Sequence, residues 1–329
     1  MLIWVSILLE KYQTYISKLR TDKNRKHWSA VTRHQAPHKP CLLLSIMDLV
    51  AQGAITDNIV RPTLDLLDTF NRYFSNLMPI GARSIMAYPF YYMRSEPFWS
   101  LIPNEGFTDK PGRTISSMTK LNQIYFGAKI DEDLFGLMAE MNSRESLRHV
   151  LVITYFTPEV QPAVLQQGAV NLQAYEYSRE LLELAEKRKV FDPQAVSREP
   201  EKRVRDQGFR RVIVDLYHHR CALCGIRMLT PEGHTVVEAA HIVPWRESQD
   251  DRPTNGMSLC RLCHWSFDQG LMSVGKSYEV QVSKRVQLEN NIPAHILPLA
   301  DRKIFTPEKE QFWPAQENLQ WHSKRIFTQ

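Results

Sequence analysis

The segment CALC at residues 221–224 and the segment LCRLCHWSFDQG at residues 259–270 each contain two cysteines separated by two residues. A C-x-x-C pair on a tight turn places two thiolates on one side of a metal, and two such pairs complete a tetrahedral Cys₄ site. Because such a site has no open position for water, the sequence predicts a structural Zn²⁺, whose binding energy becomes folding energy. The predicted ligands are Cys221, Cys224, Cys260 and Cys263.

Two alternatives for these cysteines are unrelated buried thiols and disulfides of a secreted protein. Of the five cysteines only Cys41 lies outside the two pairs, and the first nine residues, MLIWVSILL, lack a basic n-region and a cleavage site. That apolar run is also too short to cross a bilayer. We therefore expect a cytoplasmic protein without a membrane partner, in which the paired thiolates bind metal.

The residues between and just after the cysteine pairs have the chemistry that phosphodiester hydrolysis needs. Their order predicts a strand through VVEAAHIVPW, a turn and second strand at NGMSLC, and a helix from CHWSFDQGLM. The reaction needs a base for water and a divalent cation for the scissile phosphate. His241 suits the base, since imidazole is largely neutral near pH 7, and His264 suits the metal. The side-chain carbonyl of Asn255 is expected to orient His241 by accepting its other N–H.

These motifs resemble the HNH, or ββα-metal, endonuclease family, in the subgroup with an E-A-A-H-I-x-P signature and a Cys₄ zinc. The resemblance covers about residues 210–275. It implies that His241 is the general base, that Asn255 positions it, and that His264 binds one catalytic divalent cation such as Mg²⁺ or Mn²⁺.

The position just before the base departs from this family. Many members carry Asp or His there as a second metal ligand, whereas this chain has Ala240. Glu238 or Asp268 is expected to supply the missing carboxylate, although Glu238 has the alternative of holding a nearby arginine. A zinc-stapled DNA-binding protein without catalysis therefore remains an alternative.

Composition allows two domains with hydrophobic cores, because 43% of the 329 residues are hydrophobic. The net charge of +5 is compatible with a nucleic-acid partner. We predict an α+β chain with a mostly helical DNA-recognition domain at residues 1–170, a helical linker at 171–198, and the HNH domain at 199–329. The linker hinge is expected at residues 192–198.

Several further elements follow from the hydrophobic pattern. Helices are predicted at residues 1–20, 42–50, 60–78 and 170–190, and a hairpin is predicted after residue 270. Residues 150–156 suit either a strand or a buried helix end, and Pro158 and Pro162 are expected to interrupt the pattern.

The N-terminal half contains PHKP at residues 37–40, YPF at 88–90 and PFWSL at 97–101. This series resembles the sulfur-binding domain of phosphorothioate-dependent restriction endonucleases, and the resemblance covers about residues 1–170. It implies that a basic residue contacts the DNA backbone and that a shallow apolar pocket holds the sulfur. The matching residues are His38, Lys39, Tyr88 and Pro89, with Tyr91 or Tyr92 completing the wall.

The chemistry of the mark explains such a pocket. Sulfur in place of a non-bridging phosphate oxygen is larger and less well hydrated, so an apolar cup favours it over an oxygen that would lose its hydrogen bonds. The family carries arginine at the basic position, and Lys39 keeps the charge but not the planar fork. Plain core packing, recognition of another mark such as methylated cytosine, and recognition of unmodified DNA are the alternatives for this aromatic region.

Residues 202–220 combine basic residues with apolar positions at helical spacing. Arg210 and Arg211 are expected to contact phosphate, with a solvated helix face as the alternative. Together the two resemblances imply a restriction endonuclease that cuts double-stranded, phosphorothioate-modified DNA. Because one nuclease domain cuts one strand, double-strand cleavage predicts a homodimer or sequential nicking.

Overall fold

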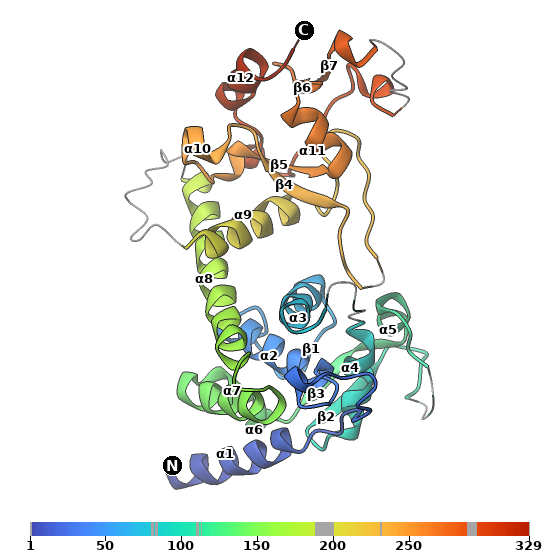
Figure 1. The fold of residues 1–329 in the computed structure, drawn as a ribbon, viewed down its shortest axis with the longest axis vertical. Coiled ribbons are helices and arrows are strands. Elements are labelled where there is room, and N and C mark those ends of the chain that lie inside the picture. The colour runs from blue at the N-terminus through green and yellow to red at the C-terminus, as the bar shows by residue number, and fades with distance from the viewer. Residues whose placement is uncertain are drawn as a thin grey trace. The chain divides into compact units, whose positions relative to one another are not determined.

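The structure is a computed structural model that describes residues 2–79, 82, 85–109, 112, 114–187, 201–230, 232–287 and 295–328. The chain divides into two compact units (Figure 1). The first comprises Met1–Leu172 with Thr230–His234, and the second comprises Gln173–Leu229 with Thr235–Gln329. The predicted hinge at residues 192–198 lies outside the described residues.

The first unit is mostly helical and contains one small sheet. Its elements are α1 (Leu2–Ser17), η1 (Ala30–Thr32), α2 (His38–Ala51), β1 (Ile59–Val60), α3 (Leu64–Leu77), α4 (Ala87–Tyr92), η2 (Met93–Ser95), β2 (Trp99–Pro103), α5 (Met118–Ile124), β3 (Tyr125–Ile130), α6 (Glu132–Ala139), α7 (Met141–Tyr155) and the first part of α8 (Gln161–Glu186).

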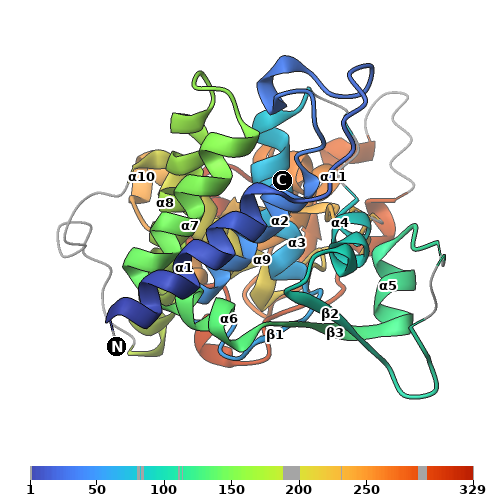
Figure 2. The same ribbon diagram turned by 90° about the horizontal axis from the view of Figure 1, so that it is seen from below.

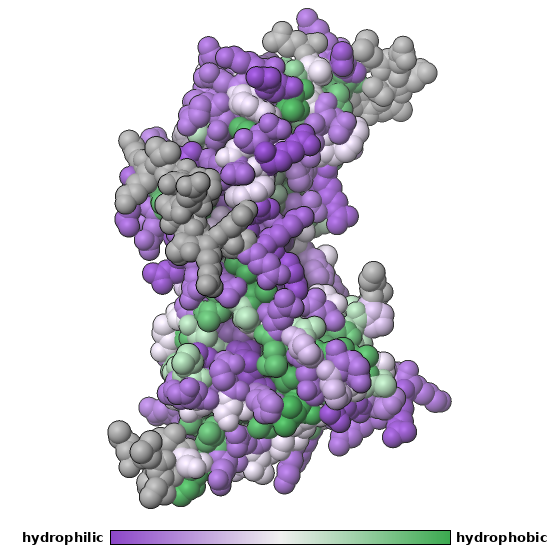
Figure 3. Space-filling model, turned by 60° about the vertical axis from the view of Figure 1, so that its left-hand side comes forward, coloured by the Kyte–Doolittle hydropathy of each residue, from purple (hydrophilic) through white to green (hydrophobic). Residues whose placement is uncertain are grey.

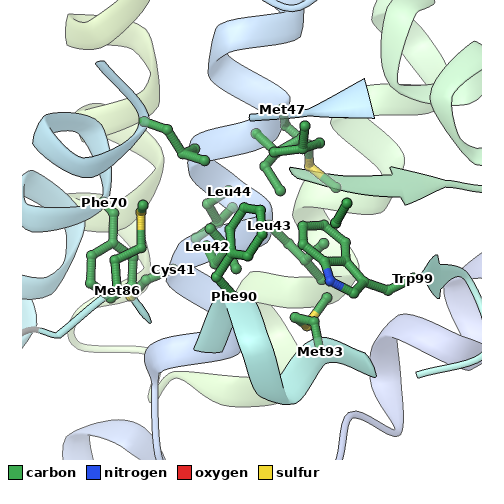
Figure 4. Close-up of a cluster of buried hydrophobic side chains, with 14 of the residues drawn as sticks. Cys41, Leu42, Leu43, Leu44, Met47, Phe70, Met86, Phe90, Met93 and Trp99 are labelled. Atoms are coloured by element: carbon green, nitrogen blue, oxygen red, sulfur yellow. The ribbon is translucent and has the colours of Figure 1, made fainter. Parts of the chain in front are cut away.

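Helix α2 is the centre of this unit's core. Its leucine-rich sequence is buried from Lys39 to Val50, so it is surrounded on all sides, as expected of a helix without a polar face. Figure 4 shows side chains of α2 meeting those of α3, α4 and β2. Pro40 is accommodated in the first turn, where its missing N–H breaks no helical bond. The helix ends before Gly53, whose φ of +70° suits glycine.

The sheet has the antiparallel order β1-β3-β2, with Leu101 opposite Ala128. Strand β3 alternates buried and exposed residues at most positions, because one face covers the core. Gly127 allows β1 to approach, since a Cβ there would lie 2.6 Å from the carbonyl oxygen of Val60. In Figure 2, α1 lies across α7, and β2 and β3 run side by side.

A buried polar network joins α2, α3, α7 and α8. Arg148 Nη2 lies 2.8 Å from Asp48 Oδ1, and Tyr73 and Asn171 donate hydrogen bonds of 2.8 and 2.7 Å to Asp48 Oδ2. All four side chains are buried. Because each oxygen of Asp48 has a partner, the network fixes the helices without leaving an unpaired buried charge.

The second unit is built around a two-stranded hairpin and the helix that follows it. Its elements are the rest of α8, α9 (Lys202–Leu216), β4 (Val237–His241), α10 (Trp245–Ser248), η3 (Pro253–Asn255), β5 (Gly256–Cys260), α11 (Arg261–Asp268), β6 (Met272–Val274), β7 (Val280–Val282), η4 (Lys284–Gln287), η5 (Leu297–Leu299), η6 (Glu310–Phe312) and α12 (Gln316–Arg325).

Strands β4 and β5 pair antiparallel, with Val237 opposite Cys260 and His241 opposite Gly256. Helices α9 and α11 both contact this hairpin (Figure 1). The predicted strand, strand and helix order is therefore confirmed, as is the predicted hairpin, now β6 and β7. The chain is α+β, as predicted, with a mostly helical first unit.

The structure decides one open prediction and corrects another. Residues 150–156 fall in and just after helix α7, so the helical alternative is the right one. Pro162 does not interrupt a helix: it lies in the first turn of α8, where proline is tolerated. None of the helices among the described residues is long and apolar enough to cross a membrane. Most of the surface visible in Figure 3 is hydrophilic, with hydrophobic side chains in scattered patches.

Candidate active site

The four paired cysteines converge on one point. Their sulfur atoms all lie within 4.8 Å of one another, and the sulfurs of Cys224 and Cys260 are 3.7 Å apart. With Zn–S bonds of about 2.3 Å, a tetrahedral site has S···S edges of about 3.8 Å, whereas a disulfide measures about 2.0 Å. The cysteines are free thiols, and the donor set and spacing fit a structural Zn²⁺.

Local backbone geometry brings the first pair together. Gly225, directly after Cys224, has a φ of +76°, and its N–H donates to the carbonyl of Cys221 at 2.9 Å. A Cβ at this position would lie 2.4 Å from the ring of Phe305. The turn therefore needs glycine for both its conformation and its packing. The second pair spans the junction of β5 and α11, so the cluster joins this turn to the end of the hairpin.

His241 is the last residue of β4 and is held on two sides. Its ring stacks on Phe209 of α9, with centroids 3.9 Å apart and an interplanar angle of 8°. Its Nε2 lies 2.6 Å from Oδ1 of Asp251. Asp251 is fully buried, and its Oδ2 accepts a hydrogen bond of 2.8 Å from the hydroxyl of Tyr177. Burial and the charge of Asp251 raise the pKa of Tyr177 well above its ordinary value, so Tyr177 keeps its proton.

The predicted hydrogen bond between Asn255 and His241 is not formed. The Oδ1 of Asn255 accepts from the Val243 N–H at 2.9 Å, and its Nδ2 donates to the carbonyls of Val243 and Asp250 at 3.0 and 2.9 Å. Asn255 is fully buried at the end of η3. These hydrogen bonds direct its side-chain amide toward the connection between β4 and β5. Asn255 thus organises the segment that carries Asp251, and it is Asp251 that contacts the imidazole.

His264 lies on α11 between the two predicted carboxylates. Its Nδ1 is 3.5 Å from Glu238 Oε2, and its Nε2 is 3.6 Å from Asp268 Oδ2. Glu238 also contacts Arg261 at 3.5 Å, so the alternative of an arginine partner is realised. Burial raises the pKa of Asp268 above its ordinary value, and the charge of His264 opposes that shift.

A pocket of about 620 Å³ brings the two histidines to one surface. His241, His264 and Asp268 line it, together with Trp245, Arg246 and His322. Of the two predicted carboxylates, Asp268 lines this pocket together with both histidines, and Glu238 does not. His322 stacks on Phe267 at 3.5 Å, and burial lowers its pKa to about 4, which makes it a neutral packing partner.

The donor set beside His264 suits a divalent cation, since carboxylates are ordinary ligands of Mg²⁺ and Mn²⁺ and an imidazole is a ligand of softer divalent cations such as Zn²⁺ and Ni²⁺. The two carboxylates lie at opposite ring nitrogens. Among the described residues, the Cys₄ cluster is the only place where three or more histidine, cysteine or acidic side chains have their ligand atoms close enough together to hold one metal ion. Ala240, in the position where many family members have a ligand, is buried in the hairpin.

The predicted phosphate contacts on α9 lie outside this pocket. Arg211 places its guanidinium over the ring of Tyr175 at 5.1 Å, and neither Arg210 nor Arg211 lines the pocket. The lining arginine is Arg246, whose side chain is 83% exposed. Arg246 directly follows the HIVPW segment that contains His241, and this position could have identified it from the sequence as a residue near the site.

The first unit contains a second pocket, of about 460 Å³, at the predicted sulfur-binding residues. His38 and Lys39 from α2 meet Tyr88, Pro89 and Tyr92 from α4, with Trp28 and Arg20 also lining it. The ring of Trp28 packs edge-on against His38 at 5.3 Å. Burial lowers the pKa of His38 to about 4, so this imidazole is neutral near pH 7 and forms part of an apolar wall.

The structure distinguishes Tyr91 from Tyr92 and gives Lys39 partners within the protein. Tyr91 is buried and does not line the pocket, whereas Tyr92 lines it together with Tyr88. Lys39 is buried, with its ammonium donating to Ser95 Oγ at 2.8 Å and paired with the buried carboxylate of Glu96. Burial lowers the pKa of Lys39, and Glu96 opposes that shift. The ammonium thus has two partners within the protein, and its predicted contact with the DNA backbone stays a prediction.

Comparison with known proteins agrees with the geometry of the second unit. Residues 221–275 match the family model described as HNH endonuclease. The chain thus carries an HNH endonuclease domain with a Cys₄ cluster. No curated protein matches the chain.

One solved structure, the modification-dependent TagI restriction endonuclease, is similar at 17% identity and a TM-score of 0.28. The similarity covers 42% of this chain and 44% of that chain, so it spans less than half of either.

Substitution of one predicted zinc ligand tests the Cys₄ cluster. We expect one Zn²⁺ per chain by elemental analysis, and we expect Cys260→Ser to lose that zinc and to lower the melting temperature of the second unit, because metal binding contributes folding energy. Cys41→Ala is the matched control, since Cys41 is buried in the other unit. Full zinc content in Cys260→Ser, or loss of zinc in Cys41→Ala, would contradict the assignment.

Proposed function

We propose that the protein is a modification-dependent DNA endonuclease that recognises phosphorothioate-modified double-stranded DNA and hydrolyses its phosphodiester bonds. The observation that carries the nuclease activity is the pocket shared by His241, His264 and Asp268, within the HNH match. The second unit would perform the hydrolysis, and the first unit would recognise the mark.

In the hydrolysis His241 takes a proton from water, which then attacks the phosphorus. The ring is held for this task by Phe209 on its face and by Asp251 at Nε2. Arg246, which is exposed at the pocket and lies 3.5 Å from Glu247, would contact a DNA phosphate. His264 with Asp268 would hold one divalent cation, with Glu238 as the alternative carboxylate. When bound, such a cation supplies charge neutralisation for the phosphate and the leaving oxygen.

The apolar pocket of the first unit supports the choice of mark. Its wall is formed by the neutral His38, by Pro89 and by two tyrosines whose rings are partly exposed. An anionic oxygen placed there would lose water without gaining a hydrogen bond, whereas sulfur tolerates the loss better. The volume of about 460 Å³ far exceeds one sulfur atom, so the pocket would also take parts of the flanking nucleotide.

Arg20 is the cation best placed for the backbone phosphate, because Lys39 is paired with Glu96. Arg20 lines the same pocket and is exposed, and its backbone N–H donates to Glu96 at 3.1 Å. Arg94, the other lining arginine, is paired with Asp109 at 2.8 Å. The guanidinium of an arginine at the edge of the pocket supplies the planar, bidentate donor that the ammonium of Lys39 lacks.

Double-strand cleavage would require two copies of the chain, or two successive nicks, because each chain offers one base. A homodimer with twofold symmetry would place one active site on each strand of the duplex.

Substitution of the base tests the nuclease. With Mg²⁺ or Mn²⁺ and modified DNA, His241→Ala is expected to reduce the cleavage rate at least about 100-fold, the range for loss of a general base. His218→Asn is the matched control: His218 is exposed, pairs only with Glu308 in the described structure, and has a φ of +51° that asparagine tolerates. Equal cleavage by both variants would exclude His241 as the base.

A single-atom change in the DNA tests the mark. We expect full-length His241→Ala protein, which cannot cut, to bind a duplex with one phosphorothioate about 5- to 150-fold more tightly than the oxygen duplex, from a desolvation cost of about 1–3 kcal/mol. Tyr92→Ala should reduce this ratio, and Phe126→Ala, an exposed aromatic outside the pocket, should not. A ratio near one, or a preference for methylated cytosine, would overturn the proposed mark while leaving the nuclease intact.

The salt dependence of binding tests Arg20. Arg20→Ala is expected to weaken binding to sulfur and oxygen duplexes by a similar factor, because the phosphate charge is present in both. The slope of log K against log salt should become shallower by about 0.9, the value for one lost phosphate contact. Lys39→Met combined with Glu96→Gln, which removes the ion pair as a unit, should leave the slope unchanged, since the pair carries no net charge. The opposite pattern, with the slope changed by this double variant and not by Arg20→Ala, would return the contact to Lys39.

A further inference from the structure

We propose that Asp251, held by Tyr177, is the positioning residue that fixes His241 as the Nε2-protonated tautomer and leaves Nδ1 free to take the proton from water. This rests on the role proposed above for His241. Asp251 was not among the residues expected from the sequence, and Tyr177 and Arg205, which contact it, lie outside the HNH match at residues 221–275.

The contacts of Asp251 indicate an ionised carboxylate. Its Oδ2 accepts from the hydroxyl of Tyr177 at 2.8 Å and lies 3.6 Å from the Nε of Arg205. A donor and a cation on this oxygen both stabilise the negative charge. The other oxygen, Oδ1, lies 2.6 Å from His241 Nε2. Because an ionised carboxylate only accepts hydrogen bonds, Nε2 must carry the hydrogen.

This hydrogen bond decides which nitrogen is available for catalysis. In a neutral imidazole one nitrogen donates and the other accepts, so the Nε2–H tautomer has its lone pair on Nδ1. Nδ1 has no partner among the described residues, and the side chain of His241 is 21% exposed while Asp251 is fully buried. Nδ1 is thus the nitrogen left for a water molecule in the pocket.

Stacking supplies the second constraint on the ring. Phe209 fixes the plane of His241 at an angle of 8°, and the hydrogen bond to Asp251 fixes its rotation within that plane. Both constraints come from buried groups on other segments, so the imidazole is oriented before substrate binds. Such preorganisation lowers the barrier because no reorientation is needed during the reaction.

The proton transfer balances within this arrangement. One O–H bond of the water breaks and Nδ1 takes that proton, while the water oxygen bonds to phosphorus. The bond from phosphorus to the leaving oxygen breaks, and the leaving oxygen takes a proton from solvent. Nε2 keeps its hydrogen, so His241 becomes an imidazolium whose positive charge faces the carboxylate of Asp251. Asp251 stabilises that cation and does not itself take a proton.

The tautomer can be measured without any cleavage. In full-length protein with ¹⁵N-labelled histidine, we expect the His241 signal, identified by its loss in His241→Ala, to show a protonated Nε2 and an unprotonated Nδ1. Asp251→Ala is expected to change that signature to a tautomer mixture. Glu308→Gln is the matched control, because it removes the carboxylate of another carboxylate–histidine pair, that of His218.

Kinetics give the second readout. Asp251→Ala is expected to lower kcat at least about 10-fold, as for other groups that orient a catalytic side chain, with KM nearly unchanged. Tyr177→Phe, which removes one hydrogen bond and keeps the carboxylate, is expected to lower kcat less. Asp251→Asn is expected to fall between them, since its carbonyl can still accept from Nε2 but has no charge. Zinc content and melting temperature verify that each variant is folded.

An Asp251→Ala protein with wild-type kcat, or with an unchanged histidine signature, would overturn the proposal. Failure of the proposed function gives a different result: the wild-type protein would then not cut the modified DNA, or His241→Ala would cut as fast as wild type, whatever the tautomer. Should Asp251→Ala fail to fold, the wild-type signature decides, because a protonated Nδ1 in that protein would overturn the proposal.

Discussion

The Cys₄ cluster is the constraint on which the nuclease site depends. It joins the turn at Cys221 and Cys224 to the junction where β5 ends and α11 begins. That junction sets the direction of α11, and α11 carries His264 and Asp268. Without this clamp a five-residue strand and an eight-residue helix would have little to define their relative position, since short elements are marginal by themselves. A metal bound by this cluster would therefore act at a distance from the chemistry, by fixing the scaffold.

His241, the proposed base, is held in another way, by contact with a buried carboxylate whose charge is fully paired. Asp251 is fully buried, and burial of an unpaired carboxylate is costly. Tyr177, Arg205 and His241 together occupy both of its oxygens. Two of these partners come from α8 and α9, so the helices that precede the motif complete its active site. A minimal HNH segment lacking them would keep the ligands but lose the groups that orient the base.

The local parts of this design could be predicted from the sequence, and the long-range parts could not. Spacing alone was enough for the cysteine pairs, the strand–strand–helix order and the two histidines, because each lies within a short segment of defined periodicity. The partner of His241 was assigned wrongly to Asn255, because Asp251 and Asn255 follow His241 in the same connection and spacing does not show which of them faces the imidazole. The contact of Tyr177 with Asp251 was not foreseen, since no pattern links residues 74 positions apart. The pairing of Lys39 with Glu96 was missed for the same reason, as Glu96 lies 57 residues away.

The neutralised Lys39 also bears on how the proposed sulfur pocket would discriminate. A phosphate and a phosphorothioate both carry a negative charge, so an unpaired cation at the base of the pocket would attract both. Pairing of Lys39 with Glu96, together with the neutral His38, leaves a wall whose net charge is close to zero. A cation at the lip, such as Arg20, then adds affinity for any backbone, and only the apolar wall distinguishes sulfur from oxygen. Affinity and selectivity would thus reside in different residues, which is the arrangement that lets a weakly basic chain search unmodified DNA without being held there.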